Sequence, residues 1–223
     1  MTLLQIVTDT TAIESAEQSI SILDLAMKGG VIMIPLALLW VIALYVFIER
    51  LITVNKAGKV PNSFMNNVKD IVTRGDVNGA KFLCSQNDTP IARIIEKGIL
   101  RIGKPIENIE KSMENTGRLE LYKLEKNMVI LTIIAGVAPM FGFLGTIAGM
   151  IQTFFNISIT SDITLGTIAG GIYVKMITSA TGLMIGIMAY IGYSYLNALI
   201  DKVVNQMEAA SAEFIDVLHT PVK

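Results

Sequence analysis

Cysteine and histidine are almost absent from this sequence, and their scarcity narrows the chemistry it can perform. Cys84 and His219 are the single residues of their types among 223. One cysteine cannot close an internal disulfide, and neither residue type is frequent enough to build a metal-ligand cluster. The net charge of −1 gives no electrostatic reason to bind nucleic acid. We therefore expect no metal, no cofactor and no nucleic-acid partner.

Signatures of an enzyme active site are missing as well. No glycine-rich phosphate loop follows an expected strand, and no serine, histidine and acid lie within plausible reach of one another. The glycines of residues 127–155 lie in an apolar run, which favours a packing role for them. The sequence therefore predicts a protein that is not an enzyme.

Apolar residues dominate instead, since 52% of the residues are hydrophobic and 17% are charged. This composition is typical of integral membrane proteins. A helix needs roughly 20 apolar residues to cross the hydrocarbon core of a bilayer, which is about 30 Å thick. Three segments are long enough, namely residues 29–50, 127–155 and 168–198. We expect an all-α integral membrane protein with three transmembrane helices embedded in a lipid bilayer.

The segment 51–126, between the first two spans, is polar and has the pattern of a helical domain. Short helices are expected at 62–74 and at 76–86, the second capped by Asp76. Thr89 followed by Pro90 predicts another helix start, because a capping hydroxyl and a proline suit the first turn. From Pro105 we find no strong breaker, so a helix is predicted to run uninterrupted into the second span. The helix of the third span is expected to continue past Asp201.

The basic residues predict the orientation of the chain in the membrane. Fourteen of the 18 lysine and arginine residues lie between Arg50 and Lys126. The positive-inside rule therefore places 51–126 in the cytoplasm and the amino terminus outside. Residues 156–167 become a periplasmic loop, and 199–223 a cytoplasmic helix and tail. Residues 1–28 are expected to hold a periplasmic amphipathic helix, or else a disordered tail whose periodicity arises by chance.

Spans two and three each carry a stripe of small and hydroxyl-bearing residues at spacings of three and four. Small side chains allow another helix backbone to approach closely. The hydroxyls either line a shared polar path or donate to carbonyls of their own helix. The stripe of span two comprises Ala135, Pro139, Gly142, Gly145, Thr146, Gly149 and Thr153, and that of span three comprises Gly171, Lys175, Thr178, Ser179, Gly182, Gly186 and Ala189, with Thr181 close by.

Lys175 is the single charged residue in the interior of the expected spans, since Glu49 and Arg50 mark the end of the first. An intramembrane charge is a functional hypothesis by default, and the alternative is a side chain that reaches toward the outer interface. No carboxylate or histidine lies inside a span, although proton relays usually depend on such groups. If this chain conducts protons, the titrating carboxylate must come from another chain. The sequence then predicts an oligomer that encloses a partner helix.

Three segments resemble the MotA/TolQ/ExbB proton-channel family. Residues 138–149, APMFGFLGTIAG, resemble the family signature APxxGLLGTVxG. Residues 178–183, TSATGL, are similar to the LATAIGL motif of the third span, and residues 74–98 look like the cytoplasmic region of ExbB. The resemblance extends from Gly29 to about Leu199, and three spans favour ExbB or TolQ over the four-span flagellar stators.

The resemblance implies a fold, partners and site residues. ExbB-like proteins form inner-membrane pentamers whose second and third spans line a pore around an ExbD-like single-span partner with an intramembrane aspartate. Proton flow there energises TonB-dependent outer-membrane transport through a TonB-like protein. By motif position, Thr146 and Ser179 take the places of the two pore threonines of the family. Val174 stands where many relatives have glutamate, which leaves the neighbouring Lys175 as a counter-charge for the partner's aspartate.

Other interpretations remain open at this stage. The chain could be a pentameric scaffold that holds a conducting partner, or it could belong to the TolQ-like or gliding-motor branches. A stand-alone transporter is poorly supported, because the sequence shows no internal repeat and no pair of broken half-helices. Apolar substitutions along the stripes separate conduction from scaffolding, since a scaffold tolerates them.

Overall fold

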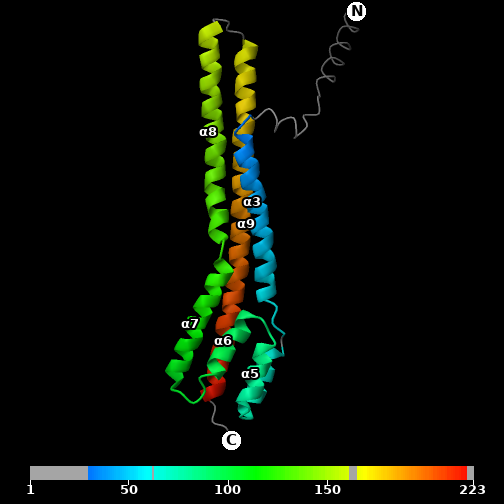
Figure 1. The fold of residues 1–223 in the computed structure, drawn as a ribbon, viewed down its shortest axis with the longest axis vertical. Helices are drawn as coiled ribbons and strands as arrows, with labels where there is room; N and C mark the ends of the chain where they lie inside the picture. The colour runs from blue at the N-terminus through cyan, green and yellow to red at the C-terminus, as the bar shows by residue number, and fades with distance from the viewer. Residues whose placement is uncertain (1–29, 62, 161–164, 220–223) are drawn as a thin grey trace, which may run out of the picture. The chain divides into compact units, whose positions relative to one another are not determined.

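Seven helices make up the part of the chain that the computed structural model describes, residues 30–61, 63–160 and 165–219 (Figure 1). They are α3 (Met33–Ala57), α4 (Phe64–Thr73), α5 (Val77–Ser85), α6 (Pro90–Ile99), α7 (Ile106–Glu125), α8 (Met128–Thr160) and α9 (Leu165–His219). These residues contain no strand. The predicted all-α class is confirmed, and α3, α8 and α9 each contain a stretch long and apolar enough to cross a membrane. The amphipathic helix predicted within 1–28 lies outside the described residues.

The two predicted helix starts in the polar segment are confirmed. The Asp76 side chain accepts a hydrogen bond from the Gly79 amide at 2.8 Å and caps α5. The Thr89 hydroxyl accepts one from the Ala92 amide at 3.3 Å, with Pro90 as the first helical residue of α6. Both caps satisfy amides that have no partner within the first turn of a helix.

The prediction of one continuous helix from Pro105 into the second span is wrong. The helix ends at Glu125 and a new one begins at Met128. Between them Lys126 is extended, with ψ of 135°, and Asn127 has a positive φ of 66°. Asparagine tolerates this left-handed conformation better than most residues, so no glycine or proline marks the break in the sequence.

Contacts from α3 explain why the break occurs at this point. Arg50, which is 5% exposed, donates from Nη1 to the carbonyl of Lys123 at 3.2 Å, close to the end of α7. Arg50 also pairs with the carboxylate of Glu49, and the Asn127 side chain lies close to that same carboxylate. We call Glu49, Arg50, Lys123 and Asn127 the α3 clamp. It replaces helical hydrogen bonds that the interruption removes.

Helices α3 and α8 extend past the limits predicted for their membrane spans. α3 continues beyond Glu49 and Arg50 to Ala57, and α9 runs to His219, which confirms the predicted continuation of the third helix. α8 reaches Thr160 and α9 begins at Leu165, so residues 156–160 and 165–167 of the predicted loop are helical.

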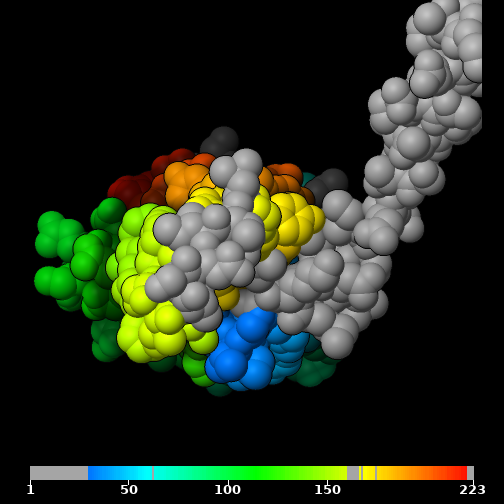
Figure 2. Space-filling model, turned by 90° about the horizontal axis from the view of Figure 1, so that it is seen from above, coloured from blue at the N-terminus to red at the C-terminus, as the bar shows by residue number. Residues whose placement is uncertain are grey.

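The chain divides into two compact units. Unit 1 consists of Met1–Val41 and Ile134–Met188, and unit 2 of Ile42–Ile133 and Ala189–Lys223. In unit 1 the start of α3 meets α8, since a Cβ placed on Gly145 would lie 3.3 Å from Ile32 Cγ2. Figure 2 shows the blue start of α3 next to the yellow-green end of α8.

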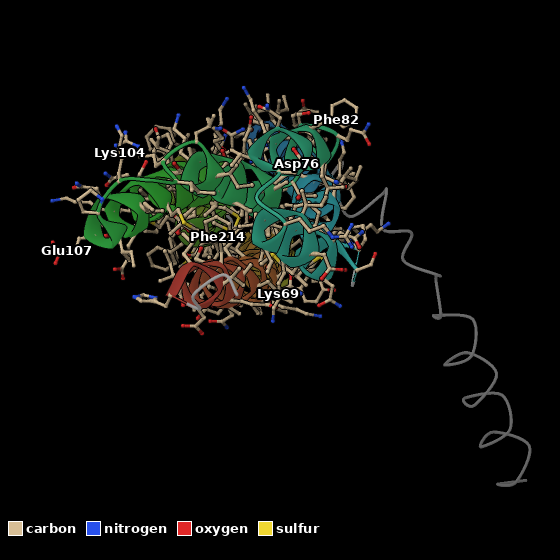
Figure 3. All side chains as sticks on the ribbon, turned by 90° about the horizontal axis from the view of Figure 1, so that it is seen from below. Lys69, Asp76, Phe82, Lys104, Glu107 and Phe214 are labelled. Atoms are coloured by element: carbon tan, nitrogen blue, oxygen red, sulfur yellow. The ribbon has the colours of Figure 1, made fainter. Side chains whose placement is uncertain are left out.

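Unit 2 has its own apolar core, in which α6 is the central element. Its residues Ile91, Ala92, Ile94, Ile95 and Ile99 are all buried. Phe214 of α9 points into this core, whereas Lys104 and Glu107 point outward (Figure 3). A Cβ on Gly98 would lie 2.6 Å from Phe214 Cε1 and 2.7 Å from Met113 Sδ, so only glycine leaves room for both side chains.

One carboxylate in unit 2 is buried between two cations. Glu120 of α7 is 3% exposed and accepts hydrogen bonds from Arg93 at 2.6 Å and Lys123 at 2.7 Å. Burial alone would raise the pKa of Glu120, but the hydrogen bonds from the two cations outweigh it, so the pKa lies below its ordinary value. This ion cluster joins α6 to α7.

Candidate functional site

The stripes of spans two and three meet each other in unit 1, where α8 and α9 run side by side. A Cβ on Gly142 would lie 2.9 Å from the Thr178 carbonyl oxygen, and one on Gly182 would lie 2.6 Å from the Ala138 carbonyl oxygen. Both glycines are buried. The two backbones therefore touch at this level, and any larger residue would force the helices apart. We call this glycine-lined contact the α8–α9 seam.

Gly186 of α9 makes room for Pro139 at the end of the seam that is nearer the start of α8. A proline at 139 cannot donate to the Ala135 carbonyl four residues earlier, which leaves that oxygen without its helical partner. A Cβ on Gly186 would lie 2.6 Å from Pro139 Cγ and 2.9 Å from the Ala135 oxygen. Glycine at 186 thus makes room for both the ring and the freed carbonyl.

Two threonine hydroxyls converge on one backbone carbonyl, that of Lys175. Thr146 of α8 donates to it at 3.1 Å across the seam and also lies 3.3 Å from the Gly142 oxygen of its own helix. Thr178 of α9, which is 1% exposed, donates to the same Lys175 oxygen at 2.7 Å. The Thr146 bond joins α8 to α9 at Lys175, whereas the Thr178 bond stays within α9 and is the own-helix alternative that the sequence left open.

The two other predicted hydroxyl groups, those of Thr181 and Ser179, differ in whether they donate a hydrogen bond. Thr181 donates to the Ile177 carbonyl at 2.9 Å, the helical back-bond that the sequence left as an alternative. Ser179 is half-buried, and its Cα would lie 3.2 Å from a Cβ on Gly142. Within the part of the chain that the structure describes, no hydrogen bond involves the Ser179 hydroxyl. Its proton is therefore available to another molecule.

Lys175 lies in the same seam, half-buried, with its aliphatic stem packed flat against Gly149. A Cβ at position 149 would overlap the Lys175 Cγ, Cδ and Cε atoms. No ion pair or hydrogen bond of its ammonium group occurs among the described residues. The side chain of Val174, the position matched to the family glutamate, lies outside the described part.

Chemically, the seam offers hydroxyls, backbone carbonyls and one cation. The described residues of unit 1, namely 30–41, 134–160 and 165–188, contain no Asp, Glu or His. Across all the described residues, no three His, Cys, Asp or Glu side chains gather where they could hold a metal ion. The seam can hold a chain of polar groups in a membrane, but its described residues supply no carboxylate and no imidazole.

Residues 86–209, which include the seam and most of unit 2, match the MotA/TolQ/ExbB proton channel family. The chain belongs to this family. The resemblance noted in the sequence is thereby confirmed, and the three apolar helices are those of a multi-pass membrane protein.

Curated relatives bear two kinds of family name. A putative biopolymer transport protein ExbB homolog of Methanothermobacter thermautotrophicus is 27% identical over 84% of this chain and 67% of its own length. A putative ExbB-like protein of Synechocystis is 29% identical over 88% of this chain and 78% of its own length. A Tol-Pal system protein TolQ of Pseudomonas aeruginosa is 28% identical over 52% of this chain and 51% of its own length. Both names occur among the relatives, so similarity does not separate the two branches.

The sequence patterns located the residues of the seam but missed their partners. Spacing found both stripes, whereas it gave no sign that Thr146 and Thr178 share the Lys175 carbonyl or that Gly149 seats the lysine stem. The seam also includes a contact between Thr153 and Gly171, where a Cβ on Gly171 would lie 2.7 Å from Thr153 Oγ1. This contact extends the seam toward the carboxyl end of α8. Helical spacing includes both residues in the two stripes, and that signal could have found the contact.

Proposed function

We propose that the chain is a proton-channel subunit of the ExbB type, which uses the proton motive force of a bacterial inner membrane to drive transport at the outer membrane. The observation that carries the proposal is a polar seam without a carboxylate in a member of a proton-channel family. Such a seam supplies hydrogen-bonding groups along the path and needs a titrating group from elsewhere. A single-span partner with an intramembrane aspartate would supply it.

The proposal extends to assembly and orientation. Copies of the chain form a closed ring, with five as the family number, around the partner helix. The polar segment 51–126 and the end of α9 lie in the cytoplasm, as their basic residues favour. A TonB-like protein receives the force.

Proton flux measures the role of the hydroxyls directly. The full chain and the proposed single-span partner are reconstituted in vesicles carrying a pH-sensitive dye, and acidification under an imposed potential is recorded. We expect Ser179→Ala and Thr146→Val each to lower the flux per folded complex by about tenfold or more, because each removes a hydroxyl from the path.

Ser158→Ala serves as the matched control, since its exposed hydroxyl donates to the Phe155 carbonyl at 2.8 Å on the outer part of α8. It should leave the flux unchanged. Full flux in both seam variants would refute the conduction role of this chain and favour the scaffold, in which the partner helices alone carry protons.

A further inference from the structure

Lys175 is the single charged residue among the described residues of unit 1. The described residues of unit 1 contain no other Lys or Arg and no Asp, Glu or His, and its ammonium has no hydrogen-bond partner there. An isolated charge is costly within a membrane, and proteins offset this cost with an opposite charge. The arrangement is therefore incomplete without an anion.

Contacts within the α8–α9 seam hold both the backbone and the stem of Lys175. Its carbonyl receives the hydroxyls of Thr146 and Thr178, and its stem rests on Gly149. On both sides of it α8 and α9 stay in contact, through Gly145 and Thr178 on one side and Thr153 and Gly171 on the other. The Lys175 side chain thus lies between two points at which α8 and α9 touch.

That place lies well inside the helix pair. From Gly149, α8 continues to Thr160, about 16 Å at 1.5 Å per residue, and from Lys175 back to Leu165 α9 spans about 15 Å. α8 has 33 residues and is about 50 Å long, which exceeds the hydrocarbon layer of about 30 Å, so a lipid phosphate is the competing anion that the test must separate from a carboxylate. A carboxylate on another membrane-spanning helix can reach it at the same depth.

We propose that Lys175 is the docking site for a carboxylate carried by a membrane-spanning helix of another chain. The inference rests on the proposed function and names the residue that recognises the partner. Ion pairing stabilises the ionised carboxylate and so lowers its pKa. No other titratable side chain faces Lys175 from α8 or from the start of α3 in the described residues, and Tyr173 is the nearest titratable residue along α9.

Gly149 and Lys175 therefore act as one unit in partner recognition. Glycine at 149 leaves space for the stem of Lys175, and this contact sets where the charge of the lysine lies. A partner carboxylate beside this cation stays ionised more readily than one without it.

A peptide probe tests the docking site without measuring proton flux. The full chain is reconstituted in phosphatidylcholine nanodiscs together with a dye-labelled leucine-rich spanning peptide that carries one Asp, placed in turn at successive positions. The matched peptide carries Asn instead. We expect binding at pH 8 to be at least about tenfold tighter for Asp than for Asn at one depth, as measured by energy transfer.

Three variants make the test specific. Lys175→Met should abolish the preference for Asp, Lys175→Arg should keep it, and Lys202→Met, which removes an exposed lysine from α9, should leave it unchanged. Gly149→Ala keeps the charge but displaces the stem, so it should weaken the preference. Circular dichroism and the elution volume confirm that each variant is folded.

Equal affinity for the two peptides at every depth would overturn the inference. So would a preference that vanishes when phosphatidylglycerol is added, because a lipid phosphate would then be the anion that Lys175 holds. Since no proton gradient is present, a negative result here with a loss of flux in Ser179→Ala would refute the docking site and leave the proposed function standing.

Discussion

The α3 clamp predicts a measurable effect of replacing Arg50 with methionine, which keeps most of the side-chain volume and removes the charge. Arg50 has a side chain that is 7% exposed and donates to the Lys123 carbonyl at the end of α7. In the variant that carbonyl and the Glu49 carboxylate lose a charged donor, and Asn127 keeps its positive φ without the clamp around it.

The magnitude follows from how exposed each partner is. A hydrogen bond from a charged donor to a poorly hydrated carbonyl contributes roughly 1.5–3 kcal/mol. The pair with Glu49 adds little, because that carboxylate is 33% exposed and screened by water. We therefore expect Arg50→Met to destabilise the break by about 2 kcal/mol, which is roughly a 30-fold increase in local opening.

Amide hydrogen exchange in nanodiscs reports this opening peptide by peptide. Exchange should accelerate at the end of α7 and the start of α8, around Glu125 to Ile130, while the α6 core near Ile95 keeps its protection. Arg118→Met is the matched control on α7, since its ion pair with Glu114 is 75% and 55% exposed and contributes little. Identical exchange in the two variants would show that the clamp does not hold the break.

Three further predictions concern the seam, the ion cluster and the buried thiol. Gly182→Val should separate α8 from α9, because its Cβ would lie 2.6 Å from the Ala138 oxygen, and should lower thermal stability, whereas Ala180→Val on the exposed side should not. Glu120 has a folded pKa below the ordinary 4.5, so its contribution is present above pH 4.5 and is lost as pH falls through the folded pKa. Glu120→Gln should therefore be less stable at pH 7, by about 2 kcal/mol, and the gap should close in acid urea titrations; a constant gap would contradict this. Burial raises the pKa of Cys84 to about 12, so iodoacetamide at pH 8 should label the folded chain at least about 1,000 times more slowly than the unfolded chain, as followed by mass spectrometry.

The features predicted well from sequence depend on a few neighbouring residues. Asp76 and Thr89 cap helices through amides three residues away, so the local pattern contains the whole interaction. The apolar runs of α3, α8 and α9 depend on composition alone, and they too were found. By contrast, the break at Asn127 depends on Arg50, which is distant in the sequence, and no local propensity reveals it.

The candidate site shows the same division between pattern and partner. Helical spacing correctly groups the glycines and threonines on one face, because the period of 3.6 residues is a property of a single helix. It cannot tell whether that face meets lipid, a second chain or the other span of the same chain. Gly142 and Gly182 touch each other's helices here, and that pairing became visible only with both helices in place.

The hydrogen bonds of the seam rank its hydroxyls for proton transfer. A relay group must both accept and donate, and Thr178 already donates to the Lys175 carbonyl at 2.7 Å. It can pass a proton only after breaking that bond within α9, and its buried side chain also packs against Gly145 of α8. Ser179 has no such commitment among the described residues, so it can donate toward a guest carboxylate without disturbing the helix pair. Thr178 is thus better suited to hold the seam, and Ser179 to exchange protons across it.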